Sequence, residues 1–245
     1  MATPMATVWS ARARALPQLF QELGRTALAT LRREGPRSGA ALRYARQHAT
    51  AGDAASVLAS LDRFAREQRF LMNVGDEKGL VLDEVVASLA PAARVLELGC
   101  FCGYSAIRMA RLLGAEGRVV SLETNPRSVD VARAMCELAG VAERVEILHG
   151  SASELIPTLR GSFDLVFIDH WKDLYRPDLE RIEAAGLLRA GSVVVADNVG
   201  PLFGAEAYLS YVRECGRYDS RYVASHLEYH DALEDGLEIS TWRGR

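Results

Sequence analysis

The segment Val95–Ser105 constrains the fold of this chain more than any other stretch. It begins as a short apolar run, breaks at Gly99 and Gly103, and resumes as an apolar helical pattern over residues 104–113. A strand, a glycine turn and a helix in this order are typical of the first unit of a nucleotide-binding α/β fold. The glycines let the backbone approach a ligand closely, and the helix N-terminus offers free N–H groups to an anionic group. Because two glycines are fewer than a full dinucleotide motif, an ordinary strand–turn–helix unit is the alternative.

The next expected strand, residues 118–122, is followed directly by an acid, Glu123. This acid lies about 20 residues after the glycine turn, where a carboxylate commonly binds the hydroxyl pair of a ribose. The alternative is that Glu123 caps the helix that follows Asn125-Pro126. The order of turn, helix, strand and acid favours ribose binding.

From Val95 onward the chain alternates between apolar runs and helical patterns. Strands are expected at 94–98, 118–122, 144–148, 164–168 and 192–196, with helices near 104–113, 126–139, 152–160 and 176–186. This alternation predicts a parallel sheet with helices on both faces. A helix near 205–215 then precedes strand-like runs near 220–227 and 236–242, which we expect to form an antiparallel edge. The predicted fold class is therefore α/β, with a mostly parallel sheet of seven strands.

Extra helices are expected ahead of this sheet. One covers about residues 40–48, and a second begins after Asp53, whose side chain is a suitable N-cap. Residues 72–79 are rich in turn formers and are predicted to be a loop that leads into another helix, which Pro91 ends.

Residues 1–40 differ in composition from the rest, because they are rich in alanine and arginine and poor in acids. Apolar residues recur in them at helical spacing: Leu16, Leu19, Phe20, Leu23, Ala27 and Leu31. We predict a basic amphipathic extension over residues 1–40 that precedes one main domain over residues 41–245, with residues 35–39 as the linker. We favour a helix that packs on its own domain or frays as a tail. The alternatives are a helix that lies on an anionic membrane surface and a transit peptide.

Composition excludes several classes of protein. The net charge of −3 gives no general case for a nucleic-acid partner. The four cysteines form no Cys-x-x-Cys pair, which argues against zinc, and Cys100 and Cys102 are too close for an ordinary disulfide. We therefore expect reduced thiols and a cytoplasmic location. No apolar run reaches the roughly 18 residues that span a membrane, and no signal-peptide core is present at the start. The oligomeric state is not predictable.

Polar side chains follow two of the expected strands directly. Asp169 comes after the 164–168 strand, and Asp197-Asn198 come after the 192–196 strand. Ligands bind at the carboxyl ends of strands in open α/β sheets, so these groups should lie together. Their oxygens suit Mg²⁺ better than zinc, and three protein ligands leave room for two substrate oxygens and a water. The alternative is that each acid only caps the segment after it.

The residues after Asp169 add further chemistry. Beside a divalent ion the charged form of Lys172 is disfavoured, so this lysine can act as a general base, although most lysines are surface cations. His170 can orient its neighbours. Trp171 can form a flat wall for an aromatic substrate, or simply pack in the core.

Taken together, these segments resemble the catechol O-methyltransferase family, which depends on S-adenosylmethionine and Mg²⁺. The resemblance runs from about Leu42 to the C-terminus. It is carried by Met72–Asp76, Leu96–Gly99, Cys102–Ser105, Met109–Leu113, Leu155–Pro157, Asp169–Asp173, Gly186–Leu188, Ala196–Val199 and Leu227–Tyr229. The His-Trp-Lys-Asp and Asp-Asn segments are specific in combination, because they supply metal ligands, a base and an aromatic wall.

The resemblance implies a Rossmann-like methyltransferase fold and a role for each matching residue. Asp169, Asp197 and Asn198 match the metal ligands, Lys172 the base, and Glu228 the acid that binds the unmethylated hydroxyl. The implied cofactor contacts are Met72, Val74, Glu97, Gly99, Tyr104, Ser105, Glu123, Thr124, Ser151, Ala152, Ser153, Asp169, His170 and Trp171. The implied substrate contacts are Phe70, Met72, Asp169, Trp171, Lys172, Asn198, Pro201 and Glu228.

The chain departs from the family pattern around the substrate. Phe70 stands where the animal enzymes carry tryptophan, Phe101 replaces a tyrosine, and the 199–205 loop differs. Three other functions are therefore alternatives. They are a metal-dependent methyltransferase for larger vicinal diphenols such as flavonoids or antibiotic precursors, a non-catalytic protein that binds S-adenosylmethionine, and a nucleic-acid methyltransferase. The last lacks a basic patch beyond residue 46.

Overall fold

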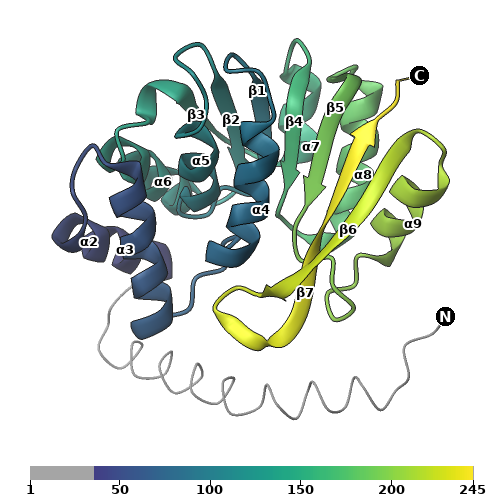
Figure 1. Cartoon of the computed structure of the whole chain (residues 1–245). Coiled ribbons are helices and arrows are strands. Elements are labelled where there is room, and N and C mark those ends of the chain that lie inside the picture. The colour runs from purple at the N-terminus through teal and green to yellow at the C-terminus, as the bar shows by residue number, and fades with distance from the viewer. Residues whose placement is uncertain (1–35, 245) are drawn as a thin grey trace.

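The computed structural model describes residues 36–244 and shows a seven-stranded sheet covered by helices on both faces (Figure 1). The strand order is β3-β2-β1-β4-β5-β7-β6, in which β1 to β5 run parallel and β7 runs antiparallel to both β5 and β6. The strands are β1 (Arg94–Leu98), β2 (Arg118–Glu123), β3 (Val145–His149), β4 (Phe163–Ile168), β5 (Leu188–Ala196), β6 (Tyr218–Leu227) and β7 (His230–Trp242). The predicted α/β class and the antiparallel C-terminal strands are confirmed.

Two apolar cores lie on opposite faces of this sheet, because successive side chains of a strand point to opposite sides. Val95 belongs to one core and Leu96 to the other. The first core is covered by α2 (Arg37–His48), α3 (Ala54–Glu67), α4 (Asp76–Ala87), α5 (Tyr104–Ala110) and α6 (Pro126–Leu138). The second is covered by α7 (Ala152–Leu155), the 3-10 turn Ile156–Thr158, α8 (Lys172–Ala184) and α9 (Glu206–Glu214).

Several predicted boundaries are wrong, and α4 is the one that matters most for function. It begins at Asp76, inside the segment 72–79 that was predicted to be a loop. Gly75, at φ +70°, ends the loop, and Asp76 and Glu77 follow in the first helical turn, where acids favour the helix dipole. Lys78 therefore belongs to α4, on the side of the helix that is buried.

Other boundaries moved by a few residues for local reasons. The segment 35–39 is not all linker, because α2 begins at Arg37, directly after Pro36, whose fixed φ prepares the first turn. Helix α8 begins at Lys172 rather than near 176, and α5 ends at Ala110 rather than near 113. Only four residues of the 152–160 segment are α-helical, because Pro157 follows within a 3-10 turn.

Some expectations about the N-terminal region lie outside the described residues. The amphipathic helix predicted for residues 1–40 lies largely before residue 36, where the description begins, so it stays a prediction. The domain boundary predicted after residue 40 also stays a prediction, and α2 crosses that position. The predicted cap of α3 is confirmed, since Asp53 accepts a hydrogen bond from the Ser56 N–H at 3.1 Å. Within residues 36–244, no helix has the length and apolar character needed to cross a membrane.

Candidate active site

The polar residues predicted from the sequence gather at the carboxyl edge of β1, β2, β4 and β5. Ile168 and Ala196 are register partners at the ends of β4 and β5, so Asp169 and Asp197 follow side by side. The Asp197 N–H donates to the Ile168 carbonyl at 3.0 Å, which fixes this arrangement. On the other side, Leu98 at the end of β1 pairs with both Ile168 and Leu122. One edge of the sheet therefore presents the glycine turn between two acidic regions.

Asp197 is fully buried and divides its two carboxylate oxygens between different tasks. Oδ1 lies 2.6 Å from the Lys78 ammonium and accepts the Asn198 N–H at 2.7 Å. Oδ2 is also buried, but it has no hydrogen-bond partner among the residues that the structure describes. Burial raises the pKa of Asp197 well above its usual range, and Lys78 opposes this rise. A buried acceptor without a partner costs free energy of folding, so this oxygen is suited to bind a cation.

Asp169 and Asn198 supply oxygens beside Asp197. Burial, together with the neighbouring Glu228 carboxylate, raises the pKa of Asp169 to about 7, while the Lys172 ammonium lowers it. Asn198 has a left-handed backbone with φ +50°, which asparagine tolerates better than most residues. Its amide oxygen accepts a hydrogen bond from Lys172 at 3.3 Å. Two carboxylates and one amide oxygen form a donor set that suits Mg²⁺.

Lys172 is the first residue of α8 and is held toward this donor set. Its ammonium donates to the Tyr175 hydroxyl at 2.7 Å and lies 4.6 Å from the centre of that ring. The Tyr175 hydroxyl in turn donates to the Asp197 carbonyl at 3.1 Å. Lys172 is therefore a half-buried group of the site and not a freely solvated surface cation.

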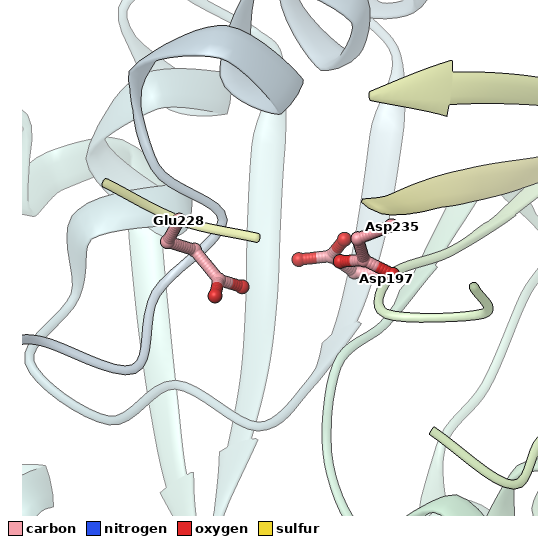
Figure 2. A group of neighbouring side chains, drawn as sticks. All are labelled: Asp197, Glu228 and Asp235. Carbon is pink, nitrogen blue, oxygen red and sulfur yellow. The ribbon is translucent and has the colours of Figure 1, made fainter. Parts of the chain in front are cut away.

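A cluster of three buried carboxylates completes the site, and one of its members, Asp235, was not predicted. Figure 2 shows Asp197 and Asp235 close together and Glu228 facing them. One oxygen of each lies within 4.8 Å of the others. Lys78 provides the cation between them, with its Nζ 2.6 Å from Asp197, 2.9 Å from Glu228 and 2.6 Å from Asp235. These three acids strongly raise the pKa of Lys78, although burial opposes the rise, so the ammonium stays charged.

Sequence reasoning missed Lys78 and Asp235. Lys78 was assigned to a loop, and only the early start of α4 turns it into the interior. Asp235 is one of several acids in the C-terminal strand, and nothing in its neighbours marks it as a site residue. A signal for Lys78 was the pattern Gly75-Asp-Glu, which favours a helix start.

Glu228 reaches the site from the tight turn between β6 and β7. The next residue, Tyr229, has φ +60°, and its hydroxyl lies 2.9 Å from the Asp62 carboxylate on α3. Glu228 is itself buried, and its Oε1 accepts from Lys78 at 2.9 Å and from the Asn198 amide at 2.8 Å. This turn of an antiparallel hairpin thus places an acid beside groups at the ends of parallel strands.

The region at the ends of β1 and β2 has a different character. Glu97 is fully buried, and its Oε2 accepts from the Ser121 hydroxyl, whereas Oε1 has no partner within the described part of the chain. Burial raises the pKa of Glu97 to about 7, against the effect of hydrogen bonds from Ser105 and Ser121. A buried carboxylate with one free oxygen fits a ligand ammonium group. Gly99 has φ +100°, and a side chain there would collide with the Asp169 carbonyl.

Glu123 connects the glycine turn to the end of β2. Its Oε2 accepts the Phe101 N–H at 2.8 Å, and its Oε1 accepts the Asn125 N–H at 2.8 Å. The cap of α6 is Asn125, which accepts the Arg127 N–H at 3.0 Å, so the capping alternative for Glu123 is wrong. Each carboxylate oxygen retains a second lone pair for a ribose hydroxyl.

Large apolar side chains stand exposed beside this edge. Met72 is 68% exposed and Trp171 is 78% exposed, so the core-packing alternative for Trp171 is wrong. Phe70 is half-buried, with its ring centre 5.3 Å from that of His230. Val74 is fully buried, whereas Pro201 lies in the exposed part of the loop after β5.

Other predicted cofactor residues already have structural partners. The Tyr104 side chain is buried, and its hydroxyl accepts from Arg108 at 3.0 Å. Ser151 forms a capping box with Glu154 at the start of α7, which Ala152 begins, and Ser153 and Thr124 are exposed. The His170 Nε2 lies 2.9 Å from Asp178, whereas its buried Nδ1 has no partner in residues 36–244.

Comparisons with known proteins agree with this geometry. A family model described as O-methyltransferase matches residues 48–205. The chain belongs to this O-methyltransferase family. Among curated relatives, the chain is 48% identical to catechol O-methyltransferase B of Danio rerio, over 83% of this chain and 78% of that protein. It is 43% identical to catechol O-methyltransferase of Mus musculus, over 83% and 77% of the two chains.

Solved structures show the same Rossmann-like fold. The cofactor-bound Rv0187 protein from MTB is 32% identical, with a TM-score of 0.66 over 78% of this chain and 90% of that one. TomG from Streptomyces achromogenes, an O-methyltransferase solved with SAM, is 26% identical, with a TM-score of 0.66 over 76% and 89%. The chain is thus an O-methyltransferase, as the resemblance predicted.

Proposed function

We propose that this enzyme transfers the methyl group of S-adenosylmethionine to one hydroxyl of a catechol, with Mg²⁺ as the metal. The observation that carries the proposal is the buried Asp197 Oδ2, which lies in a set of oxygen donors beside a half-buried lysine. The names of the curated relatives support a catechol as the acceptor, and they do not favour the larger vicinal diphenols.

Asp169, Asp197 and Asn198 would hold the metal. When bound there, Mg²⁺ supplies Lewis acidity that favours ionisation of a coordinated hydroxyl. The chain prepares this site by holding Asp197 Oδ1 against Lys78, which leaves Oδ2 for the ion. One carboxylate would therefore bind the Lys78 ammonium through Oδ1 and the metal ion through Oδ2.

Lys172 is the proposed general base. A phenol with a pKa of about 10 is mostly protonated at pH 7, a gap worth about 4 kcal/mol. Lys172 Nζ already lies 3.3 Å from the proposed ligand Asn198 Oδ1, so it is close to where an acceptor hydroxyl would lie. The neutral Tyr175 hydroxyl, 2.7 Å away, holds the lysine without fixing its charge.

Glu228 and the exposed apolar side chains are proposed to orient the acceptor. Glu228 Oε1 is bound to Lys78 and Asn198, so we assign Oε2 to the second hydroxyl of the catechol. Trp171, Met72 and Phe70 provide apolar surface for the aromatic ring. Alignment of an oxygen with the methyl donor can lower the barrier by about 7–11 kcal/mol.

The cofactor is proposed to bind along the ends of β1 and β2. Glu97 Oε1 would accept a hydrogen bond from the ammonium group of the cofactor's methionine part, and Glu123 would bind the ribose. Residues 151–153 and Trp171 are assigned to the adenine side, and His170 is a further proposed contact of the cofactor. Tyr104 would contribute through its backbone, because its hydroxyl is bonded to Arg108.

We also propose that the enzyme acts in the cytoplasm. The described chain has four free cysteines, three of them buried, which fits a reducing compartment. Contact of residues 1–40 with a membrane surface stays a prediction.

The test is a mass-spectrometric assay with S-adenosylmethionine and 3,4-dihydroxybenzoate, in Mg²⁺ or in excess EDTA. We expect a singly methylated product in Mg²⁺ that disappears with EDTA. The matched control acceptor is 3-hydroxybenzoate, which lacks the vicinal hydroxyl and should not react. Product that forms equally in EDTA would contradict the metal, and absence of product in Mg²⁺ would contradict the acceptor.

A further inference from the structure

Asp235 lies directly behind the proposed metal ligand Asn198. It is 1% exposed and belongs to β7, the strand between β5 and β6. Its Oδ2 accepts from the Asn198 amide nitrogen at 2.8 Å and from Lys78 at 2.6 Å. Its Oδ1 accepts the Gly200 N–H at 3.0 Å, and the neighbouring Gly236 carbonyl accepts the Val199 N–H at 3.2 Å. Asp235 therefore contacts the loop after β5 through both of its oxygens.

These contacts determine which end of the Asn198 side chain faces the site. The two ends of an amide have nearly the same shape, but only the oxygen can bind a cation. The amide nitrogen donates one proton to Glu228 Oε1 and the other to Asp235 Oδ2, both at 2.8 Å. A flipped amide would turn its oxygen toward two carboxylates and lose both bonds.

Asp235 is the fixed member of this pair of acceptors. Glu228 lies in a tight turn and is assigned to the substrate, so its carboxylate has a second task. Asp235 is held by Lys78 and by the backbone of Gly200, and a side chain at Gly200 would come within 2.7 Å of the Asp235 Cα. The close packing of β7 on this loop leaves the Asp235 carboxylate little freedom.

We infer that Asp235 is a positioning residue that keeps Asn198 Oδ1, and not Nδ2, directed toward the metal site. The inference rests on the proposed metal-dependent function. Only a carboxylate satisfies its surroundings, because all three neighbours are donors: the Asn198 amide, the Lys78 ammonium and the Gly200 N–H. An asparagine at position 235 would have to point its NH₂ group at one of them.

The experiment measures Mn²⁺ binding by electron paramagnetic resonance, using the full chain without an acceptor. We expect Asp235→Asn to weaken Mn²⁺ binding about 10- to 100-fold, the range usual for partners that orient a metal ligand. The matched control is Glu238→Gln, which removes another buried carboxylate of β7, one paired with Arg213 at 2.6 Å. We expect it to leave Mn²⁺ affinity unchanged. Binding of S-adenosylhomocysteine by calorimetry reports whether each variant is folded, and Asp235→Ala replaces Asp235→Asn if the latter is not.

A second background separates orientation from charge. In Asn198→Asp both ends of the side chain are oxygens, so orientation no longer matters, and adding Asp235→Asn should cause no further loss of Mn²⁺ affinity. An equal loss in both backgrounds would overturn the inference, because Asp235 would then act through its charge. Unchanged Mn²⁺ affinity in Asp235→Asn alone would overturn it as well. No Mn²⁺ binding by the unsubstituted protein would overturn both the proposed metal site and this inference.

Discussion

The first turns of α4 and α8 each bring one lysine to the same edge of the sheet, but they prepare it for different tasks. Lys78 in α4 is 1% exposed and lies within 3 Å of three carboxylates, at 2.6, 2.9 and 2.6 Å. Lys172 in α8 is half-buried and donates to a hydroxyl and an amide oxygen, both neutral. The same side chain is thus a permanent structural cation in one place and a candidate proton acceptor in the other. The charge of the hydrogen-bond partners makes the difference.

The largest expected effect comes from Lys172. Lys172→Arg keeps a cation at the site, but a guanidinium cannot give up its proton, so we expect turnover to fall about 100- to 10,000-fold. The assay is the mass-spectrometric measurement of methylated 3,4-dihydroxybenzoate. The midpoint of thermal unfolding should stay close to that of the unsubstituted protein. Near-normal turnover in Lys172→Arg would remove this lysine from the role of base and erase the contrast with Lys78.

Lys78 should instead act mainly on stability. Lys78→Met leaves three buried carboxylates without their shared cation, so we expect unfolding free energy to fall by about 3–5 kcal/mol. Urea unfolding followed by circular dichroism measures this loss. The matched control is Arg243→Met, which removes an ion pair to Asp219 with exposed side chains, 53% and 67%. That change should cost less than about 1 kcal/mol. Equal losses in the two variants would contradict the structural role of Lys78.

Glu97 sharpens the comparison from the side of the acids, because it is buried without a lysine. Its raised pKa of about 7 means that the cofactor-free protein carries a proton there at lower pH. If Glu97 binds the methionine ammonium, it must be ionised, so affinity for S-adenosylhomocysteine should fall as pH decreases below about 7, approaching tenfold for each unit. Calorimetry between about pH 5.5 and about pH 8 measures the slope.

The control for this pH dependence is Glu97→Gln, which has no carboxyl group to titrate. It should bind weakly at every pH and lose most of the slope. The same shift has a consequence for stability with the opposite sign. Because the folded state holds the Glu97 proton more tightly than the unfolded state, this group lowers stability as pH rises from about 4.5 to about 7. A slope that persists in Glu97→Gln would assign the pH dependence to another group.

The sequence allowed the sheet and the two strand-end acids to be predicted, because both follow from local patterns. Apolar runs alternate with helical segments, and Asp169 and Asp197 come directly after two such runs. Parallel strands align their carboxyl ends, so these two acids had to meet once the fold class was known. Glu228 followed only from the family resemblance. Its approach depends on the pairing of β6 with β7, and that register leaves no mark in the residues around it.

Lys78 and Asp235 escaped prediction for a related reason. The turn formers of residues 72–79 indicate a loop, and their tendency is overridden after Gly75, where α4 begins. Once that helix is placed, the buried position of Lys78 depends on acids more than a hundred residues away in the chain. Local propensity carries no information about such partners. Predictions from the sequence are therefore least accurate at the boundaries of the helices that border the site.

The placement of β7 has a consequence for how the enzyme comes into being on the ribosome. Among the elements that the structure describes, β7 is synthesised last, yet it lies inside the sheet between β5 and β6. A nascent chain that ends before residue 230 lacks both Asp235 and the strand on which β6 pairs, while β1 to β5 can already align. The strand that carries Asp235 is thus the last of these strands to be synthesised. A polypeptide that ends before residue 230 would contain the residues proposed to bind the cofactor but would lack Asp235. We therefore expect enzymatic activity to begin only after translation has passed β7.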